Sequence, residues 1–155
     1  PEDVIDGVLI RPLTWHNDQR GSLAELVRTD DEALMQAPLG QVYVTTLYPG
    51  VVKAWHKHER QWDRMTCLRG RVLLGLVDDR SDSPTRGESM SIFLGDRNFS
   101  LVQFPPGIWH GLKNIGPEEA MVCNCVSAPY DRDNPDEIRL APHGTLDFDW
   151  SRTDF

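Results

Sequence analysis

Four side chains that can bind a metal or move a proton lie in two short segments of the chain. His56 and His58 stand two positions apart and are followed by Asp63, whereas His110 comes shortly after a Pro-Pro-Gly turn at 105–107. Side chains two positions apart lie on the same face of a strand, so both imidazoles of the first segment can point into a β-barrel. We therefore expect these four residues to converge on one interior point from two neighbouring strands.

That set of residues indicates one chemistry directly, a mononuclear metal site. Imidazole nitrogens and a carboxylate suit Fe(II), Mn(II), Ni(II) or Zn(II). On this interpretation His56, His58, Asp63 and His110 bind one divalent ion and leave coordination positions open. Such a site would support isomerase or dioxygenase chemistry.

Short strands are the elements that must position these residues. Runs of β-favouring residues, about four to eight long, alternate with Pro, Gly and Asp turn signals at roughly ten-residue spacing. This pattern is typical of an all-β sandwich or barrel. The clearest runs are 41–47, 71–77, 100–104 and 120–126.

Two segments differ from that pattern. Residues 30–37 (DDEALMQA) predict a helical turn or two between an aspartate cap and Pro38. The tail, 130–155, is polar and contains prolines, so we expect it to wrap around the fold with a short edge strand near 146–150. We expect the whole chain, 1–155, to form a single domain.

Composition limits the kinds of partner the protein can bind and the cellular compartment expected for it. The 155 residues include 16 basic and 24 acidic side chains, a net charge of −8, which argues against a nucleic-acid polymer or an anionic membrane as partner. No apolar run approaches the ~18 residues of a membrane helix, and no basic-then-apolar leader opens the chain. Three cysteines, an odd number, predict no disulfide framework. We therefore expect a cytoplasmic protein.

The order and spacing of the two histidine segments resemble the two motifs of the cupin superfamily. Metal-binding cupins take two histidines and a glutamate from the first motif and a third histidine from the second. Asp63 stands where that glutamate would be. The resemblance implies a cupin-type double-stranded β-helix, also called a jelly roll.

Further segments match one family within that superfamily. Residues 18–25 (DQRGSLAE) are similar to DxRGxFxE, and 61–70 (QWDRMTCLRG) align without gaps with QxKLVxCxxG. Residues 77–87 (VDDRSDSPTRG) match VDxRxxSPTxG, the longest and most distinctive of these motifs. The chain thus resembles the dTDP-4-dehydrorhamnose 3,5-epimerases, which act on a nucleotide-linked 4-keto-6-deoxy sugar, over about residues 6–150.

The resemblance implies catalytic roles for two positions. His56 falls on the base that removes the proton next to the sugar ketone, a step that needs a base titrating near neutral pH. The family's catalytic tyrosine, the acid on the opposite face, aligns with Asn124, and an amide is no proton donor at neutral pH. The family also has a tail aspartate that polarises the base, whereas residues 138–143 (IRLAPH) offer no carboxylate in its place.

The same resemblance implies substrate-binding roles. Arg20 and Lys53 fall where the family uses arginines to hold the diphosphate, and lysine at 53 keeps the charge but loses the bidentate fork. Glu25 and Tyr130 fall on residues that contact the nucleoside. Two further positions fall on pocket residues that contact the sugar or the phosphates, Gln41 and His110.

Departures from the family gather in the innermost pocket. Asp63 replaces a lysine and His58 a glutamine, while the phosphate-side residues are kept. We therefore expect a related ligand and altered chemistry, from a nucleotide-sugar epimerase or close derivative that needs no cofactor. Two alternatives stay open: the metal-dependent cupin described above, and a sugar-nucleotide binding module whose catalytic set has decayed.

Two partners are expected, a small nucleotide sugar and a second copy of the chain. Small antiparallel sandwiches leave edge strands that a twin can cover. The resemblance implies a homodimer in which the segment from Arg20 to Glu25 reaches into the neighbour's pocket.

Overall fold

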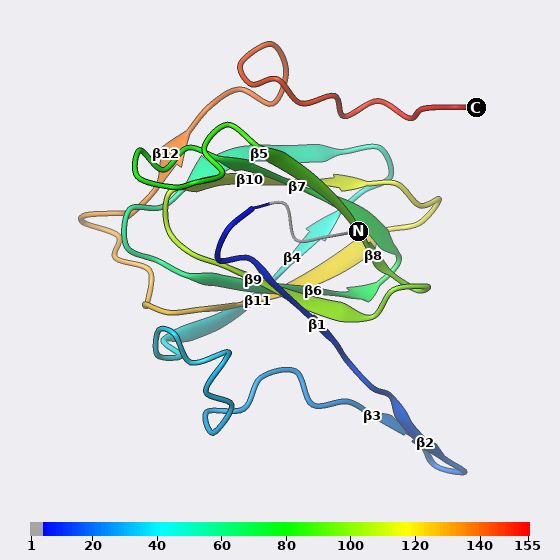
Figure 1. Cartoon of the computed structure of the whole chain (residues 1–155). Helices are drawn as coiled ribbons and strands as arrows, with labels where there is room; N and C mark the ends of the chain where they lie inside the picture. Colours follow the sequence, from blue (N-terminus) through cyan, green and yellow to red (C-terminus); the bar gives the residue numbers. More distant parts are fainter. Residues whose placement is uncertain (1–4) are drawn as a thin grey trace.

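Strands form all the regular secondary structure in residues 5–155, the part of the chain that the computed structural model describes (Figure 1). The all-β prediction is therefore confirmed. This part of the chain contains no helix that is long and apolar enough to cross a membrane. The strands are β1 (Leu9–Pro12), β2 (His16–Asp18), β3 (Gly21–Leu23), β4 (Gln41–Leu47), β5 (Val52–Lys57), β6 (Asp63–Arg69), β7 (Arg71–Asp78), β8 (Ser89–Gly95), β9 (Ser100–Phe104), β10 (Ile108–Asn114), β11 (Ala120–Val126) and β12 (Ile138–Arg139).

Two five-stranded sheets face each other and make up the body of the molecule (Figure 1). The strand order is β1-β9-β6-β11-β4 in the first sheet and β12-β5-β10-β7-β8 in the second. All pairings are antiparallel, and the chain crosses between the sheets repeatedly. This is the jelly-roll arrangement that the resemblance to cupins implied. The hairpin of β2 and β3 projects away from the two sheets (Figure 1).

Alternating residues of both sheets form the apolar core. Leu74 and Leu76 of β7 and Phe104 of β9 are fully buried, and Val122 of β11 packs with them. Burying apolar surface contributes about 25 cal/mol per Å², so this layer provides the main force that holds the two sheets together.

The C-terminal tail packs flat on the outer face of the second sheet, so the edge strand expected near 146–150 is wrong. Phe148 and Trp150 lie over Gly75 and Gly111, where a Cβ added to Gly75 would come within 2.7 Å of the Phe148 ring. The two rings also contact Trp55, at centroid distances of 5.2 and 4.9 Å. Glycines in the sheet leave space for aromatic rings, and packing them there replaces strand pairing.

The helical turn expected at 30–37 is present as a single turn, because the Met35 N–H donates to the Asp31 carbonyl at 3.0 Å and the Leu34 N–H donates to the same carbonyl at 3.1 Å. The Arg64 side chain is fully buried, and its Nε donates to the carbonyl of Leu34 at 2.8 Å. The Gln103 amide donates to the carbonyl of Ala33 at 3.0 Å. The turn does not extend into a helix, because Pro38 has no N–H to donate to the Leu34 carbonyl. The carbonyls of Leu34 and Ala33 accept these side-chain donors instead.

The motif at 77–87 forms a cage around one buried carboxylate. The Asp78 side chain is fully buried and accepts hydrogen bonds from Arg80 Nε (2.9 Å), Ser83 Oγ (2.6 Å) and Thr85 Oγ1 (2.8 Å). Burial would raise the pKa of Asp78, but these hydrogen bonds outweigh it and the pKa is lowered. The spacing of the motif therefore serves the scaffold, because it places three donors around one charge.

Asp78→Ala should lower the free energy of unfolding by about 3 kcal/mol, because it leaves the Arg80 charge without its partner. The depressed pKa means that the carboxylate stabilises the fold above about pH 4, and that this contribution disappears as the pH falls through the lower folded-state value. Urea unfolding of the variant against the exposed neighbour variant Asp82→Ala checks this. Equal loss of stability in the two variants would contradict the cage.

The cysteines behave as the odd count predicted. Cys67, Cys123 and Cys125 are all free and buried. Burial raises the pKa of the Cys67 thiol to about 11, so it remains a thiol at neutral pH and acts as a small apolar core residue.

Candidate active site

Three histidines lie together at one end of the second sheet. His110 on β10 is the register partner of His56 on β5, with ring centroids 6.0 Å apart. His58 follows β5, and its ring lies 5.1 Å from that of His110. The turn before β10 is fixed to this segment, because the Gly107 N–H donates to the His58 carbonyl at 2.8 Å. The structure thus gathers the imidazoles that the spacing placed on one face.

Polar residues of the first sheet approach the same point. Asp63, at the start of β6, is 1% exposed, and its Oδ2 lies 3.6 Å from His58 Nε2. Its Oδ1 accepts a hydrogen bond from Asn124 Nδ2 at 2.8 Å. The Asn124 amide oxygen in turn accepts the backbone N–H of Arg64 at 3.0 Å. Asn124 therefore organises a buried polar layer.

Two of the histidines are oriented by backbone carbonyls. His58 Nδ1 lies against the carbonyl of Asp136, and His110 Nδ1 lies 3.2 Å from the carbonyl of Ile108. A carbonyl only accepts, so each Nδ1 carries a hydrogen. Burial lowers the pKa of His110 to about 4 despite the nearby charge of Asp63, so its imidazole is neutral at pH 7.

His58, Asp63 and His110 are the residues best placed to hold a metal ion. Their ligand atoms all lie within 4.8 Å of one another. Histidine ligands usually donate the other ring N–H to a carbonyl or carboxylate, as His58 and His110 do here. His56, the fourth predicted ligand, lies outside this group.

His56 instead bonds to a carboxylate from the tail. Its Nδ1 lies 2.8 Å from Glu137 Oε1, and Glu137 Oε2 accepts two hydrogen bonds from Arg139, at 2.9 and 2.7 Å. Burial would raise the pKa of Glu137, but Arg139 and His56 outweigh it and the pKa is lowered. The expectation that the tail has no carboxylate beside the base is therefore wrong. Glu137 precedes the region where the sequence comparison looked for one.

Strand pairing and a loop clamp explain why the tail reaches the site. In β12 the register partner of His56 is Arg139, two residues after Glu137. The Asp136 carboxylate accepts the backbone N–H groups of residues 59, 60 and 61 at 2.8, 2.9 and 3.0 Å. Asp136 and Glu137 together therefore fasten the tail to the loop after β5 and orient both His56 and His58.

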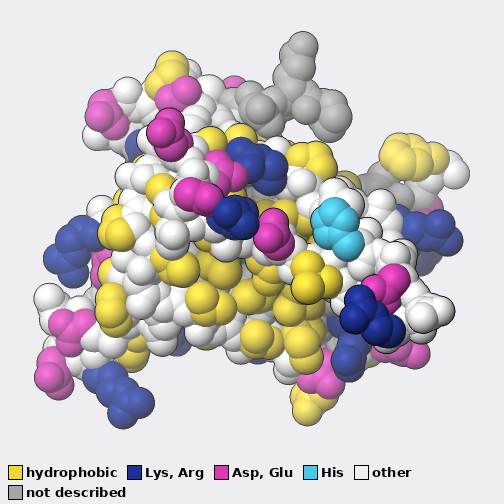
Figure 2. Space-filling model, turned by 90° about the horizontal axis from the view of Figure 1, so that it is seen from below, with side chains coloured by type: hydrophobic (Ala, Val, Ile, Leu, Met, Phe, Trp, Pro, Cys, Tyr) yellow, Lys and Arg dark blue, Asp and Glu magenta, His cyan; other side chains and the backbone are white. Residues whose placement is uncertain are grey.

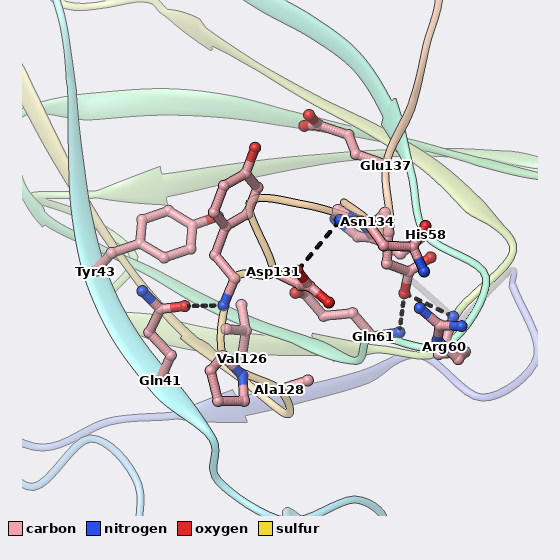
Figure 3. Close-up of a pocket in the computed structure, with 13 residues that line it drawn as sticks. Gln41, Tyr43, His58, Arg60, Gln61, Val126, Ala128, Asp131, Asn134 and Glu137 are labelled. Carbon is pink, nitrogen blue, oxygen red and sulfur yellow. Dashed lines mark hydrogen bonds between the residues drawn. The ribbon is translucent and has the colours of Figure 1, made fainter.

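A cavity of about 340 Å³ opens beside these groups (Figure 3). Its lining includes Gln41 and Tyr43 of β4, together with His58, Tyr130 and Glu137. The Gln41 side chain accepts the backbone N–H of Tyr130 at 2.8 Å, which ties the tail to β4. The volume is of the size that small-molecule sites have.

Tyr43 is a cavity residue that the sequence analysis missed. It is the register partner of Asn124, and its hydroxyl lies 2.9 Å from Asn124 Nδ2. Burial of the hydroxyl and the charge of Asp63 raise its pKa to about 12. The available signal was strand alternation, because Tyr43 stands two positions after Gln41 and shares its face.

Four predicted substrate-binding residues do not line the cavity of this single chain: the buried His110 and three charged residues. Arg20 lies in the projecting hairpin, where its side chain is 85% exposed and paired with Asp18. Glu25 forms an ion pair with Arg28 at 3.2 Å. The third charged residue, Lys53, donates to Thr45 Oγ1 and to the carbonyl of Thr46 at 3.0 and 2.7 Å.

The sequence and the fold resemble those of a known protein family, of individual relatives and of a solved structure. Residues 2–154 match the family described as dTDP-4-dehydrorhamnose 3,5-epimerase. The chain is 41% identical over 138 residues to the probable low-salt glycan biosynthesis epimerase Agl13 of Haloferax volcanii, covering 88% of this chain and 87% of that protein. It is 39% identical to the spore coat polysaccharide biosynthesis protein SpsL of Bacillus subtilis, covering 96% and 97%. The crystal structure of NovW, a 4-keto-6-deoxy sugar epimerase from the novobiocin cluster of Streptomyces spheroides, superposes with a TM-score of 0.84 at 30% identity, covering 98% of this chain and 78% of that one.

Proposed function

The chain belongs to the dTDP-4-dehydrorhamnose 3,5-epimerase family, and we propose that it epimerises a dTDP-4-keto-6-deoxyhexose or a related sugar nucleotide with His56 as the base. The hydrogen bond of 2.8 Å between His56 Nδ1 and Glu137 carries this proposal. It supplies the carboxylate partner that a histidine base needs and that the sequence alone did not reveal.

The His56–Glu137 pair suits abstraction of a proton next to a ketone. A carboxylate accepts but does not donate, so Nδ1 carries the hydrogen and Nε2 keeps the lone pair that takes the proton. The charge of Glu137 stabilises the imidazolium that forms. The electron pair of the broken C–H bond moves to the ketone oxygen as an enolate, and return of a proton from the other face inverts the carbon.

The named relatives support the same substrate class. NovW is an epimerase of a 4-keto-6-deoxy sugar, and two curated relatives are named for the synthesis of a glycan and of a spore coat polysaccharide. The activity proposed for this chain therefore belongs to carbohydrate biosynthesis, where an epimerised sugar nucleotide is a precursor of a polysaccharide.

Incubation with a dTDP-4-keto-6-deoxyhexose in deuterated water tests the function. The wild-type protein should place deuterium next to the ketone, and His56→Ala should abolish it. Glu137→Gln should lower kcat by about 100-fold with little change in KM, because Glu137 acts through His56 and not on the substrate. Glu119→Gln, at an exposed turn, is the matched control. A wild-type protein that incorporates no deuterium would refute the proposal for that substrate.

A second candidate is a metal-dependent isomerase or dioxygenase, which the grouping of His58, Asp63 and His110 favours. These residues would hold a divalent ion, which would supply a Lewis acid for a substrate oxygen. Treating the protein with a chelator before the same assay separates the two candidates. Proton transfer by His56 and Glu137 should survive chelation, whereas a metal-dependent reaction should be lost and return on adding the metal.

We further propose that the protein is a homodimer with a shared site. β4 is the edge strand of the first sheet, and its outward residues Val42 and Val44 are 54% and 51% exposed. Figure 2 shows hydrophobic side chains gathered on this side of the molecule. The projecting hairpin, with Leu23 62% exposed, is free to carry Arg20 toward the cavity of a second copy. This arrangement would explain why Asp18 is the one side chain of residues 5–155 that pairs with the Arg20 guanidinium.

Val44→Glu should weaken dimerisation by placing a charge on the proposed interface. Light scattering across a dilution series should show dissociation at higher protein concentration than in the wild type, with epimerase activity falling in parallel. Phe93→Glu is the matched control, since Phe93 is 59% exposed on β8 at an edge of the other sheet. Full activity in a Val44→Glu monomer would rule out the shared site.

A further inference from the structure

Inverting a carbon requires a proton donor on the face opposite to the base. His56 belongs to the second sheet and its partner Glu137 lines the cavity, so the donor is expected on the first sheet across the cavity. Asn124 is on that sheet, but its amide cannot act as an acid. Two phenols line the cavity, Tyr43 and Tyr130.

Tyr43 has the required position. It lies on β4 of the first sheet, directly opposite Asn124 in the register of β4 and β11. In Figure 3 its ring reaches into the cavity, while Glu137, the partner of His56, lies on the far side. Tyr130 differs in its anchoring. Tyr43 is itself 41% exposed and Tyr130 59%, but Tyr130 lies on the tail and is held through its backbone N–H by Gln41, whereas the Tyr43 hydroxyl is bonded to Asn124.

The hydrogen bonds of Asn124 determine which way the Tyr43 hydroxyl donates. The Asn124 oxygen accepts the Arg64 N–H, so both amide hydrogens point the other way, to Asp63 Oδ1 at 2.8 Å and to the Tyr43 oxygen at 2.9 Å. The Tyr43 oxygen is therefore an acceptor in that bond. Its own hydrogen is left free to point into the cavity.

We propose that Tyr43 is the acid that protonates the carbon on the face opposite His56, and that Asn124 is the positioning residue that aims its hydroxyl. The assignment rests on the proposed epimerase function and deepens it. The family's tyrosine aligns with Asn124 on β11, whereas the donor proposed here stands on the neighbouring strand β4 and places its hydroxyl beside Asn124.

The protonation state of Tyr43 agrees with that role. Burial, with a further contribution from the charges of Asp63 and Glu137, raises its pKa to about 12, although the bond from Asn124 acts in the opposite direction. The phenol therefore keeps its proton at neutral pH until an enolate, which is a stronger base than water, takes it.

The proton balance of the reaction closes without a cofactor. His56 Nε2 takes the proton from the carbon, and the C–H electron pair forms the enolate. The enolate carbon then takes the Tyr43 hydroxyl proton from the other face, and the O–H electron pair remains on the phenolate. The phenolate regains a proton from water while the imidazolium loses one to water, so the enzyme returns to its starting state.

Tyr43→Phe separates the two half-reactions in deuterated water. His56 can still remove the proton and return deuterium to the same face, so exchange next to the ketone should continue within a few-fold of the wild-type rate. Formation of the epimerised sugar should fall by about 100-fold or more. Tyr48→Phe is the matched control, because Tyr48 is 71% exposed and does not line the cavity; it should exchange and epimerise like the wild type.

Each other outcome has a definite meaning. A Tyr43→Phe protein that epimerises at the wild-type rate overturns the role of Tyr43 and leaves the proposed function intact. Equal loss of exchange and epimerisation also overturns it, because it would indicate that the hydroxyl serves binding or folding. A wild-type protein that does neither overturns the proposed function, and the role of Tyr43 with it.

Discussion

The contact between Glu137 and His56 is the interaction on which the rest of the site depends. A neutral imidazole has two tautomers, and a fixed hydrogen-bond partner at one nitrogen decides which nitrogen keeps its lone pair. Glu137 does so at 2.8 Å, and Arg139 keeps it ionised in a half-buried position. Because Glu137 lies about 80 residues from His56 along the chain, the base exists only once the tail has docked.

Hydrogen bonds of Asp136 hold the tail against the loop after β5. Asp136 satisfies three consecutive backbone N–H groups of the loop after β5, and its carbonyl orients His58. Two of these three N–H groups are exposed, so each bond contributes only modestly, but together the three bonds hold the loop and the tail to each other. Behind them, Tyr43, Asn124 and Asp63 form a continuous chain of hydrogen bonds from the first sheet. Tyr43, the proposed acid, and Glu137, the partner of the proposed base, thus line one cavity and are held in place before any substrate arrives.

Local patterns were enough to predict the longer strands of the two sheets, but not β1 or β12. The runs 41–47, 100–104 and 120–126 coincide with β4, β9 and β11, because half-buried strands require alternation and β-favouring residues. The strand expected near 146–150 failed for the opposite reason, since its aromatic rings fill the glycine gaps of β7 and β10 and this packing overrides local preference. These are contacts that no short window of sequence contains.

Some site residues could likewise be predicted from local sequence, and others could not. Histidines two positions apart indicate a shared face, so His56 and His58 could be placed from spacing alone. Glu137 and Tyr43 could not, since their roles come from pairing with β5 and β11 over long sequence separations. The role of Arg20 could not be derived from its own chain either, because the hairpin that carries it projects away from the two sheets (Figure 1).

Nitrogen-15 NMR of protein labelled in its histidines, at a pH where the ring is neutral, tests the central claim most directly. The account predicts that His56 carries its hydrogen on Nδ1 with Nε2 bare, and that Glu137→Leu removes this preference. A His56 ring protonated on Nε2 in the wild type, or one that is unchanged in Glu137→Leu, would contradict it.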